Sequence, residues 1–551
     1  MSGASLWLLV PLAPLLAIGA LAIWRERAVG WLWLACVPAL LLVVQPMPTL
    51  NLPMLWDGIR WGSSDDLSRA WLGFTALLWG CAGVFASSSQ KGDPRQMRFW
   101  TFWLMALAGN LLLIVAADAL SFYLGFSAMS LSAYGLIVHQ GGSGPRRAGR
   151  LYLQLAICGE MALLAGLMLR SHAAGGDFSF AAWQSVPMDG LTLVLLLIGL
   201  GLKAGFWPLH VWLPLAHPAA PAPASAVLSG AMLKAGLLGI WRCLPEGDPL
   251  LSRWAEVLLV MGILGAIYPA LMGLIAGKAK AVLAYSSVSQ MGYLVILMAL
   301  AWRHPDQHQA MTLVLMLYGV HHGLAKGALF LAAGLIHAGK LPRIGWLLLA
   351  LPALAIVGLP LTSGGAVKTA LKDVWYAGEY EGWLLWLTVS SLTTALLLAR
   401  ALWLLRCDAV DAPPRRPPLL QVMPWALLSV LALLLPWLWP VLREPMLHGL
   451  YPGGVWSSLW PSLLALCVAG LVVKRGFKVP ARLAKLPNPA LSLSLYLKRL
   501  VMQPPMAVPT VRPDARLWRA RERRWNRFWN KGALAMSTWI LAVLLWLGWL
   551  W

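Results

Sequence analysis

The chain is dominated by apolar blocks, most of them long enough to cross a lipid bilayer, and this pattern limits its fold more than any other feature. Crossing the hydrocarbon core takes roughly 20 residues of helix, and a lipid-exposed segment must satisfy every backbone hydrogen bond internally. Only 12% of the 551 residues are charged, whereas a soluble domain has about 25%. The sequence predicts an all-α polytopic membrane protein with about 14–16 transmembrane helices. The expected spans begin near residues 5, 30, 69, 98, 119, 150, 190, 222, 254, 281, 309, 345, 382, 420, 458 and 533.

The formal net charge of +22 is carried mostly by loops between the apolar blocks and by a C-terminal stretch. This placement favours membrane topology and lipid headgroups over nucleic acid. The more basic set of alternate loops carries Arg25, Arg27, Lys91, Arg95, Arg98, Arg146, Arg147, Arg150, Lys278, Lys280, Lys340, Arg343, Arg406, Arg415 and Arg416. The less basic set carries Arg60, Arg69, Arg170, Arg242, Arg253, Arg303, Lys372 and Arg443. The first set is expected in the cytoplasm, with both termini in the periplasm of a bacterial inner membrane.

Residues 475–532 form a basic, Pro- and Arg-rich stretch before a last apolar block at 533–551. Within the stretch Trp518, Trp525 and Trp529 are spaced by seven and four residues, which suits one face of a helix. We expect an interfacial amphipathic helix on the cytoplasmic side; a solvated basic loop is the alternative. The six cysteines are far apart and form no C-x-x-C pair, so we expect no metal site and no cofactor.

Two apolar runs are interrupted by proline. The first reads FWPLH at 206–210, and the second reads GLPLTSGG at 358–365. A weak internal repeat accompanies them, because residues 151–161 and 283–293 open two spans in a similar way. Interrupted helices at corresponding positions of two repeated halves point to an ion site near the midplane of a transporter.

Ionisable residues inside spans are costly and mark candidate functional sites. The principal candidates are Glu160, Lys203, Lys234, His322, Lys326 and Lys368. His322 and Lys326 are four apart and share a helix face. A single lysine near a span end often extends to the interface instead, but all four of these lysines lie in Gly- and Ala-rich stretches that let helices approach closely. His210, His217, Lys372 and Arg400 are accessory candidates that could equally be polar lining or helix ends.

Burial removes the hydration that stabilises an ammonium group, so a buried lysine can exchange its proton near neutral pH. A nearby carboxylate would hold that proton, and loss of the carboxylate would release it. The sequence therefore predicts that protons pass along these lysines and His322 by way of bound water.

Three segments carry a family resemblance. Residues 203–236 read KAGFWPLHVWLPLAHPAAPAPASAVLSGAMLKAG, residues 280–293 read KAVLAYSSVSQMGY, and residues 322–334 read HGLAKGALFLAAG. They resemble the antiporter-like proton-conducting subunits of complex I, Mrp-type cation antiporters and membrane-bound hydrogenases. The resemblance covers roughly residues 98–410.

The resemblance implies two inverted five-helix repeats at 98–250 and 251–410, whose broken helices are the seventh and twelfth spans. Additional helices would lie at 1–97 and 411–474. The family's proton-carrying residues correspond to Lys203 in the first broken helix, Lys234 in the eighth span, His322 and Lys326 in the centre, and Lys368 in the twelfth span.

The chain departs from the family in its fifth span. Relatives usually carry a glutamate there that pairs with the broken-helix lysine, whereas this chain has Ser127 within FSAM at 126–129. Glu160 in the next span and Asp118 at the end of the fourth are the candidates to replace it.

The resemblance implies a subunit of a larger membrane complex, with redox chemistry, if any, in other subunits. The expected role is proton translocation driven by a redox partner. A conduit whose proton flow drives a zinc-containing, carbonic-anhydrase-like subunit for inorganic carbon uptake is one alternative. An Mrp-like cation–proton antiporter component and a membrane anchor for a cytoplasmic enzyme are the others.

Overall fold

The computed structural model describes residues 3–44, 48–53, 55, 58–62, 65–377, 384–475, 520, 521, 524 and 539. The basic segment expected at 475–532 and the span expected at 533–551 lie outside the described residues, apart from these isolated positions.

Thirteen helices in the described part of the chain are long and apolar enough to cross a membrane, as an all-α polytopic membrane protein requires. They are α1 (Leu9–Trp24), α3 (Asp66–Ser89), α4 (Gln96–Val115), α5 (Ala119–Ile137), α6 (Ser143–Ala173), α8 (Gly190–Ala204) with α9 (Leu213–Ala219), α10 (Ala222–Val227) with α11 (Lys234–Cys243), α12 (Pro249–Ile275), α13 (Ala279–Arg303), α14 (His308–Ala338), α17 (Leu384–Asp408), α18 (Leu419–Leu438) and α20 (Pro452–Lys474).

Two further expected spans are shorter helices in the structure. The span expected near residue 30 contains α2 (Val37–Val44), and the one near residue 345 is α15 (Arg343–Val357), followed by α16 (Ser363–Ala377). Besides several 3₁₀ turns and one π-helical turn, the described chain contains the short helices α7 (Phe180–Trp183) and α19 (Pro440–His448) and a small antiparallel pair, β1 (Leu50–Asn51) and β2 (Arg60–Trp61).

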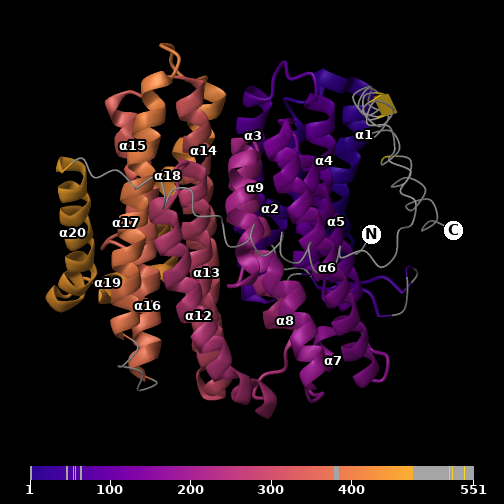
Figure 1. The fold of residues 1–551 in the computed structure, drawn as a ribbon. Coiled ribbons are helices and arrows are strands. Elements are labelled where there is room, and N and C mark those ends of the chain that lie inside the picture. Colours follow the sequence, from indigo (N-terminus) through magenta and orange to yellow (C-terminus); the bar gives the residue numbers. More distant parts are fainter. Residues whose placement is uncertain are drawn as a thin grey trace, which may run out of the picture.

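The long helices stand side by side in one slab (Figure 1). Helices α1, α4, α5 and α6 lie towards one end of the slab, α3 and α12 to α14 lie towards the middle, and α20 forms the opposite edge. Helices α10, α11, α13 and α14 are the most enclosed, because most of their residues are buried within the bundle. The centre of the slab is therefore where a polar side chain is best shielded from lipid.

The helix pairs α4–α5 and α12–α13 are both packed closely at glycine residues. A Cβ atom on Gly109 of α4 would lie 2.4 Å from the Met129 nitrogen of α5, and one on Gly292 of α13 would lie 2.3 Å from the Ala266 nitrogen of α12. Only glycine allows backbones to approach so closely, which is how membrane helices gain contact area. The α4–α5 and α12–α13 pairs are thus equivalent in construction.

Both interrupted helices break at a glycine in the left-handed conformation. Helix α8 ends at Ala204 and is followed by Gly205 with φ of 70°, and α15 ends at Val357 and is followed by Gly358 with φ of 81°. Glycine adopts positive φ without the cost that a side chain imposes. The two breaks predicted from the sequence are confirmed.

Arg242 of α11 forms hydrogen bonds with the C-terminal end of α4. Its guanidinium donates hydrogen bonds to the carbonyl oxygens of Leu113 (3.0 Å), Ile114 (2.6 Å) and Ala116 (2.9 Å), and to Ser68 Oγ (2.6 Å). The last carbonyls of a helix have no intrahelical partner, so this arginine satisfies groups that would otherwise be buried and unpaired.

Candidate functional site

Lys203 lies in the last turn of α8, just before the first break, and is almost fully buried. Its Nζ atom donates hydrogen bonds to Ser130 Oγ (3.0 Å) and Tyr152 OH (3.2 Å). The ammonium also lies 5.9 Å from the ring centre of Phe126 and 5.7 Å from that of Tyr152. The groups that contact this ammonium directly are therefore hydroxyls and aromatic faces, which carry no full charge.

Glu160 of α6 is a buried carboxylate close to Lys203, as the glutamate expected on α5 would be. It is 6% exposed, interacts electrostatically with Lys203 and neighbours the hydroxyls of Ser127 and Ser130. Its Oε1 atom has no hydrogen-bond partner among the described residues. A buried carboxylate with a spare acceptor beside a buried ammonium can hold or release that lysine's proton.

The carboxylate of Asp118 makes its hydrogen bonds away from Lys203. Its carboxylate accepts hydrogen bonds from the backbone nitrogens of Leu120 (3.1 Å), Ser121 (2.7 Å) and Arg60 (3.1 Å), and so caps the start of α5. Burial raises the pKa of this carboxyl, against these hydrogen bonds. Of the two carboxylates that the sequence offers to Lys203, the geometry favours Glu160.

The central cluster consists of Lys234, His322 and Lys326, each with no exposed surface. Lys234 Nζ donates to the Ser229 carbonyl oxygen at 2.7 Å, within the π-helical turn that joins α10 to α11. Lys326 Nζ donates to the Leu283 carbonyl oxygen at 3.0 Å. Both ring nitrogens of His322 lack a partner within the described structure. The three groups repel one another when charged, so the cluster disfavours carrying all its protons at once.

Lys368 occupies the second break. Its Nζ atom donates to the carbonyl oxygen of Val357 and to Ser391 Oγ, the latter at 2.9 Å. A Cβ atom on Gly358 would lie within 2.4 Å of the Lys368 side chain. The glycine at the break therefore also provides the space in which the lysine lies.

Polar side chains that we did not predict fill the space between the central cluster and Lys368. His321 Nδ1 lies 2.7 Å from Ser363 Oγ of α16. Tyr318 OH donates to Gln290 Oε1, and Gln290 Nε2 donates to Thr394 Oγ1 of α17 at 3.1 Å. His321 adjoins His322 in sequence, and Gln290 lies inside the motif at 280–293. Both could have been named from the sequence, because each is a strongly polar residue inside an apolar span.

The accessory candidates divide into two groups. His217 of α9 is fully buried, stacks on Phe330 at 4.4 Å and is electrostatically coupled to Lys280 and Lys326. It therefore adjoins the central cluster. Lys372 lies one turn after Lys368 and donates to Ser457 Oγ of α20 at 3.0 Å.

His210 and Arg400 stand apart from that cluster. His210 packs edge-on against Tyr268, with ring centres 6.1 Å apart. Arg400 lies 4.7 Å from the ring centre of Trp403 and donates to the Ala276 carbonyl oxygen at 3.4 Å. Among the described residues there is no cluster of three or more His, Cys, Asp or Glu side chains that could hold a metal ion.

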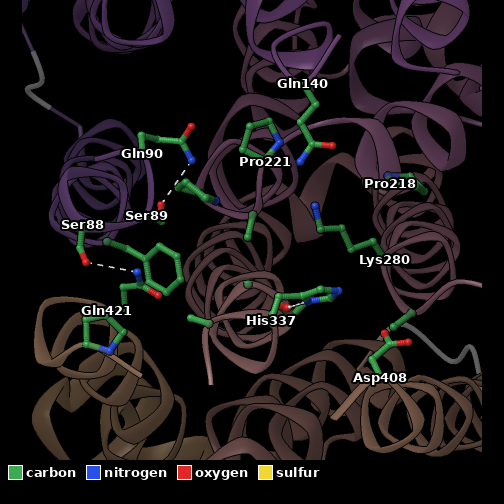
Figure 2. Close-up of a pocket in the computed structure, with 18 of the residues that line it drawn as sticks. Ser88, Ser89, Gln90, Gln140, Pro218, Pro221, Lys280, His337, Asp408 and Gln421 are labelled. Atoms are coloured by element: carbon green, nitrogen blue, oxygen red, sulfur yellow. Dashed lines mark hydrogen bonds between the residues drawn. The ribbon is translucent and has the colours of Figure 1, made fainter. Parts of the chain in front are cut away.

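A polar cavity of about 900 Å³, here called the vestibule, opens among the helix ends at one side of the slab. Figure 2 shows Lys280, Gln140, His337 and Gln421 among its lining residues. Lys280 Nζ donates to the Ala220 carbonyl oxygen at 2.6 Å. Since His217 neighbours Lys280, the floor of the vestibule lies next to the buried basic groups.

Comparison with known proteins agrees with the motifs. The family described as NADH:quinone oxidoreductase/Mrp antiporter, TM, matches residues 116–396. The chain is 31% identical over 299 residues to hydrogenase-4 component B of Escherichia coli (strain K12), an alignment covering 50% of this chain and 44% of that protein. It is 31% identical over 334 residues to NAD(P)H-quinone oxidoreductase chain 4 1 of Synechococcus elongatus, covering 56% and 60%. The chain therefore spans about half the length of these curated relatives.

A solved structure shares the fold. The Mrp complex from Dietzia sp. DQ12-45-1b contains a chain that superposes with a TM-score of 0.66 at 21% sequence identity, covering 82% of this chain and 98% of that one. The motifs at 203–236, 280–293 and 322–334 all fall within the matched residues 116–396. Because that match takes in just over half of the sequence, the chain belongs to the NADH:quinone oxidoreductase/Mrp antiporter family of membrane subunits.

Proposed function

We propose that this chain is a proton-translocating subunit of a multi-subunit membrane complex, and that protons pass among its buried lysines and histidines. The observation that carries the proposal is the series Lys203, Lys234, Lys326 and Lys368. Lys203, Lys234 and Lys326 are buried within the bundle and Lys368 is half-buried, and each of the four donates to a neutral oxygen rather than to a carboxylate. An ammonium held only by neutral oxygens is costly to keep charged, so such lysines are suited to accept and release protons.

The polar groups between the lysines support passage across the slab. His321 with Ser363, and Tyr318 with Gln290 and Thr394, form two hydrogen-bonded links from α14 towards α16 and α17. Lys368 meets Ser391 of the same α17. Hydroxyl, amide and imidazole groups with bound water can relay a proton without any of them moving far.

We also propose that residues 98–250 and 251–410 are the two repeats that the resemblance implies. In each, two glycine-packed helices precede a long third helix, a helix broken at a left-handed glycine and a closing helix. A lysine lies beside each break, the buried Lys203 before the first and the half-buried Lys368 after the second.

The cytoplasmic side is proposed to be the one with the vestibule. Its lining brings together five of the residues that the loop-charge pattern assigns to the cytoplasm: Lys91, Lys278, Lys280, Arg415 and Arg416. Their convergence on one side of the slab supports that assignment, because excess lysine and arginine mark cytoplasmic loops.

Proton flux into proteoliposomes containing the intact complex tests the function. Lys203→Ala, Lys234→Ala and Lys368→Ala should each abolish complex-dependent flux, whereas Lys340→Ala, at an exposed lysine after α14, should leave it unchanged. Normal flux in all three buried-lysine variants would overturn the assignment.

A conduit whose proton flow drives a partner, such as a zinc-containing, carbonic-anhydrase-like subunit, is the second candidate. Ser127 in place of the usual glutamate favours it, because a pump depends on a gated lysine more strictly than a conduit does. Flux that follows an imposed pH gradient without any electron donor would support the conduit, and flux that requires a donor would support the pump.

A further inference from the structure

The vestibule has an unequal charge distribution. Its lining includes the five cations Lys91, Lys278, Lys280, Arg415 and Arg416, and Asp408 is the one carboxylate among the lining residues that the structure describes. The cations come from three segments: the loop after α3, the α12–α13 loop with the first turn of α13, and the stretch between α17 and α18. The electrostatic potential inside such a cavity is positive, and it attracts an anionic occupant.

The size and spread of the cavity favour an extended occupant over a small anion. A volume of about 900 Å³ could hold roughly 30 waters, far more space than one inorganic anion fills. The cations stand on separate segments rather than converging on one point. Several negative charges spaced along a chain would match them better than a single charge.

The neutral lining groups suit a polypeptide. Gln90, Gln140 and Gln421 contribute amides, and Ser88 and Ser89 contribute hydroxyls. Figure 2 shows the side chains of Gln140 and Lys280 extending towards each other across the opening. Amides both donate and accept, so they can pair with peptide N–H and C=O groups while the cations pair with carboxylates.

We propose that the vestibule docks an acidic, extended segment of a partner protein on the proposed cytoplasmic side. The chain's own C-terminal stretch does not have the required charge, since residues 512–531 carry eight Arg and Lys against Asp514 and Glu522. A lipid headgroup fits less well, because much of the wall comes from α10, α13 and α14, which are enclosed within the bundle.

The docked segment would lie next to the buried lysines and histidines of the proposed proton path. Lys280 meets the Ala220 carbonyl oxygen and neighbours His217, which in turn neighbours Lys326. A partner carboxylate beside Lys280 would therefore supply negative charge where the chain has only basic groups. This consequence rests on the proposed proton path, whereas docking itself does not.

Binding of a defined probe tests the docking. Full-length protein in nanodiscs of neutral lipid is titrated with a fluorescent ten-residue peptide that alternates Asp and Ser, and with the same peptide carrying Asn for Asp. The acidic peptide should bind, the neutral one should bind at least tenfold more weakly, and 0.5 M salt should weaken binding about tenfold, because exposed charge pairs are screened.

Two double variants that change the net charge by the same amount test where the peptide binds. Lys91→Glu with Arg416→Glu reverses two exposed cations of the vestibule and should weaken binding about tenfold or more. Arg27→Glu with Arg147→Glu reverses two exposed cations of the same predicted side that do not line it, and should change binding less than twofold. Equal losses in the two variants, or equal binding of the acidic and neutral peptides, would overturn the proposal.

Crosslinking in native membranes identifies the occupant. A photocrosslinker at Gln140 should capture a segment of another protein rich in Asp and Glu, and one at Arg147 should not. Capture of only lipid at Gln140, or of only this chain's own residues 476–551, would contradict the proposal. Proton flux through the isolated protein is measured separately, so a failure of docking is distinguishable from a failure of the proton path.

Discussion

Lys203 Nζ and Ser130 Oγ lie 3.0 Å apart, which joins the end of α8 to the middle of α5. Ser127, one turn earlier on α5, stands where relatives carry a glutamate, and Glu160 of α6 neighbours both serines. The hydroxyl of Ser130 therefore occupies the position between lysine and carboxylate. We propose that Glu160 of α6 supplies the negative charge that the family resemblance leads us to expect on α5.

Glu160→Gln should lower complex-dependent proton flux as strongly as Lys203→Ala, because it removes the only charge that balances Lys203 in the described surroundings of that lysine. The double variant Ser127→Glu with Glu160→Gln should restore a substantial part of the flux, since it returns a carboxylate to the same polar site from α5. Flux is measured in proteoliposomes at matched protein content.

Asp118→Asn is the matched control for that experiment, because Asp118 caps α5 and accepts backbone hydrogen bonds away from Lys203. It should reduce thermal stability more than flux per folded molecule. Normal flux in Glu160→Gln, or a larger loss in Asp118→Asn, would assign the carboxylate role elsewhere.

Gly358→Ala should impair proton flux by displacing Lys368. The added Cβ would lie 2.4 Å from Lys368 Cδ and 2.8 Å from its Nζ, so the side chain must leave its contact with the Val357 carbonyl oxygen. Positive φ adds backbone strain of about 1–2 kcal/mol. Gly470→Ala, at a glycine of α20 with open space around it, should leave flux unchanged and should not lower stability, because alanine is the better helix former. An active Gly358→Ala protein would show that the position of Lys368 at the break is not required.

Much of the fold could be predicted from the sequence because bilayer thickness, backbone hydrogen bonding and loop charge act locally. Apolar length gave the spans, and GFWP at 205–208 and GLP at 358–360 gave the breaks. The span expected near residue 30 appears among the described residues as an apolar helix over Leu32–Val44, which begins as a 3₁₀ turn over Leu32–Cys36 and continues as α2. The length of an apolar run does not indicate where a helix changes from α to 3₁₀ geometry.

The site was predicted in part. Charged residues in apolar runs are conspicuous, so Lys203, Lys234, Lys326 and Lys368 could be named one by one. Tyr318, Ser363 and Thr394 could not, because tyrosine, serine and threonine are ordinary in membrane helices. Their role depends on which helices lie side by side, and that is set by long-range packing that no local pattern encodes. The choice between Glu160 and Asp118 required the same information.

Arg242→Ala should destabilise the protein without a direct effect on the proton path. It would leave the carbonyl oxygens of Leu113, Ile114 and Ala116 without their shared donor, at a cost of about 3 kcal/mol. Thermal unfolding in detergent should show a clearly lower midpoint, with Arg242→Lys intermediate because an ammonium cannot fork between the carbonyls. Arg253→Ala, at an exposed arginine of α12, is the control and should leave the midpoint unchanged. A midpoint unaffected in Arg242→Ala would mean that water replaces the guanidinium.

His139 should make the protein less stable in acid. It lies two residues beyond α5, is 1% exposed, and its Nε2 atom lies 3.1 Å from Asp93 Oδ2. Burial lowers its pKa from 6.5 to about 4, and Asp93 opposes that shift only in part. The folded protein therefore holds this imidazole neutral at pH 5, whereas the unfolded chain binds a proton. Stability from this group is complete above pH 6.5 and is lost as the pH falls towards 4, by up to roughly 3 kcal/mol.

His139→Gln removes that titration, so its unfolding midpoint should fall less between pH 7 and pH 4.5 than that of the unaltered protein. Asp93 should contribute little to the difference over this range, because its hydrogen bonds and the neighbouring Arg95 and His139 hold its pKa below the usual value despite partial burial. His172→Gln, at an exposed histidine that ends α6, is the matched control and should follow the unaltered protein. Parallel pH profiles for His139→Gln and the unaltered protein would mean that His139 is protonated in the folded state without cost, with Asp93 as its counter-ion.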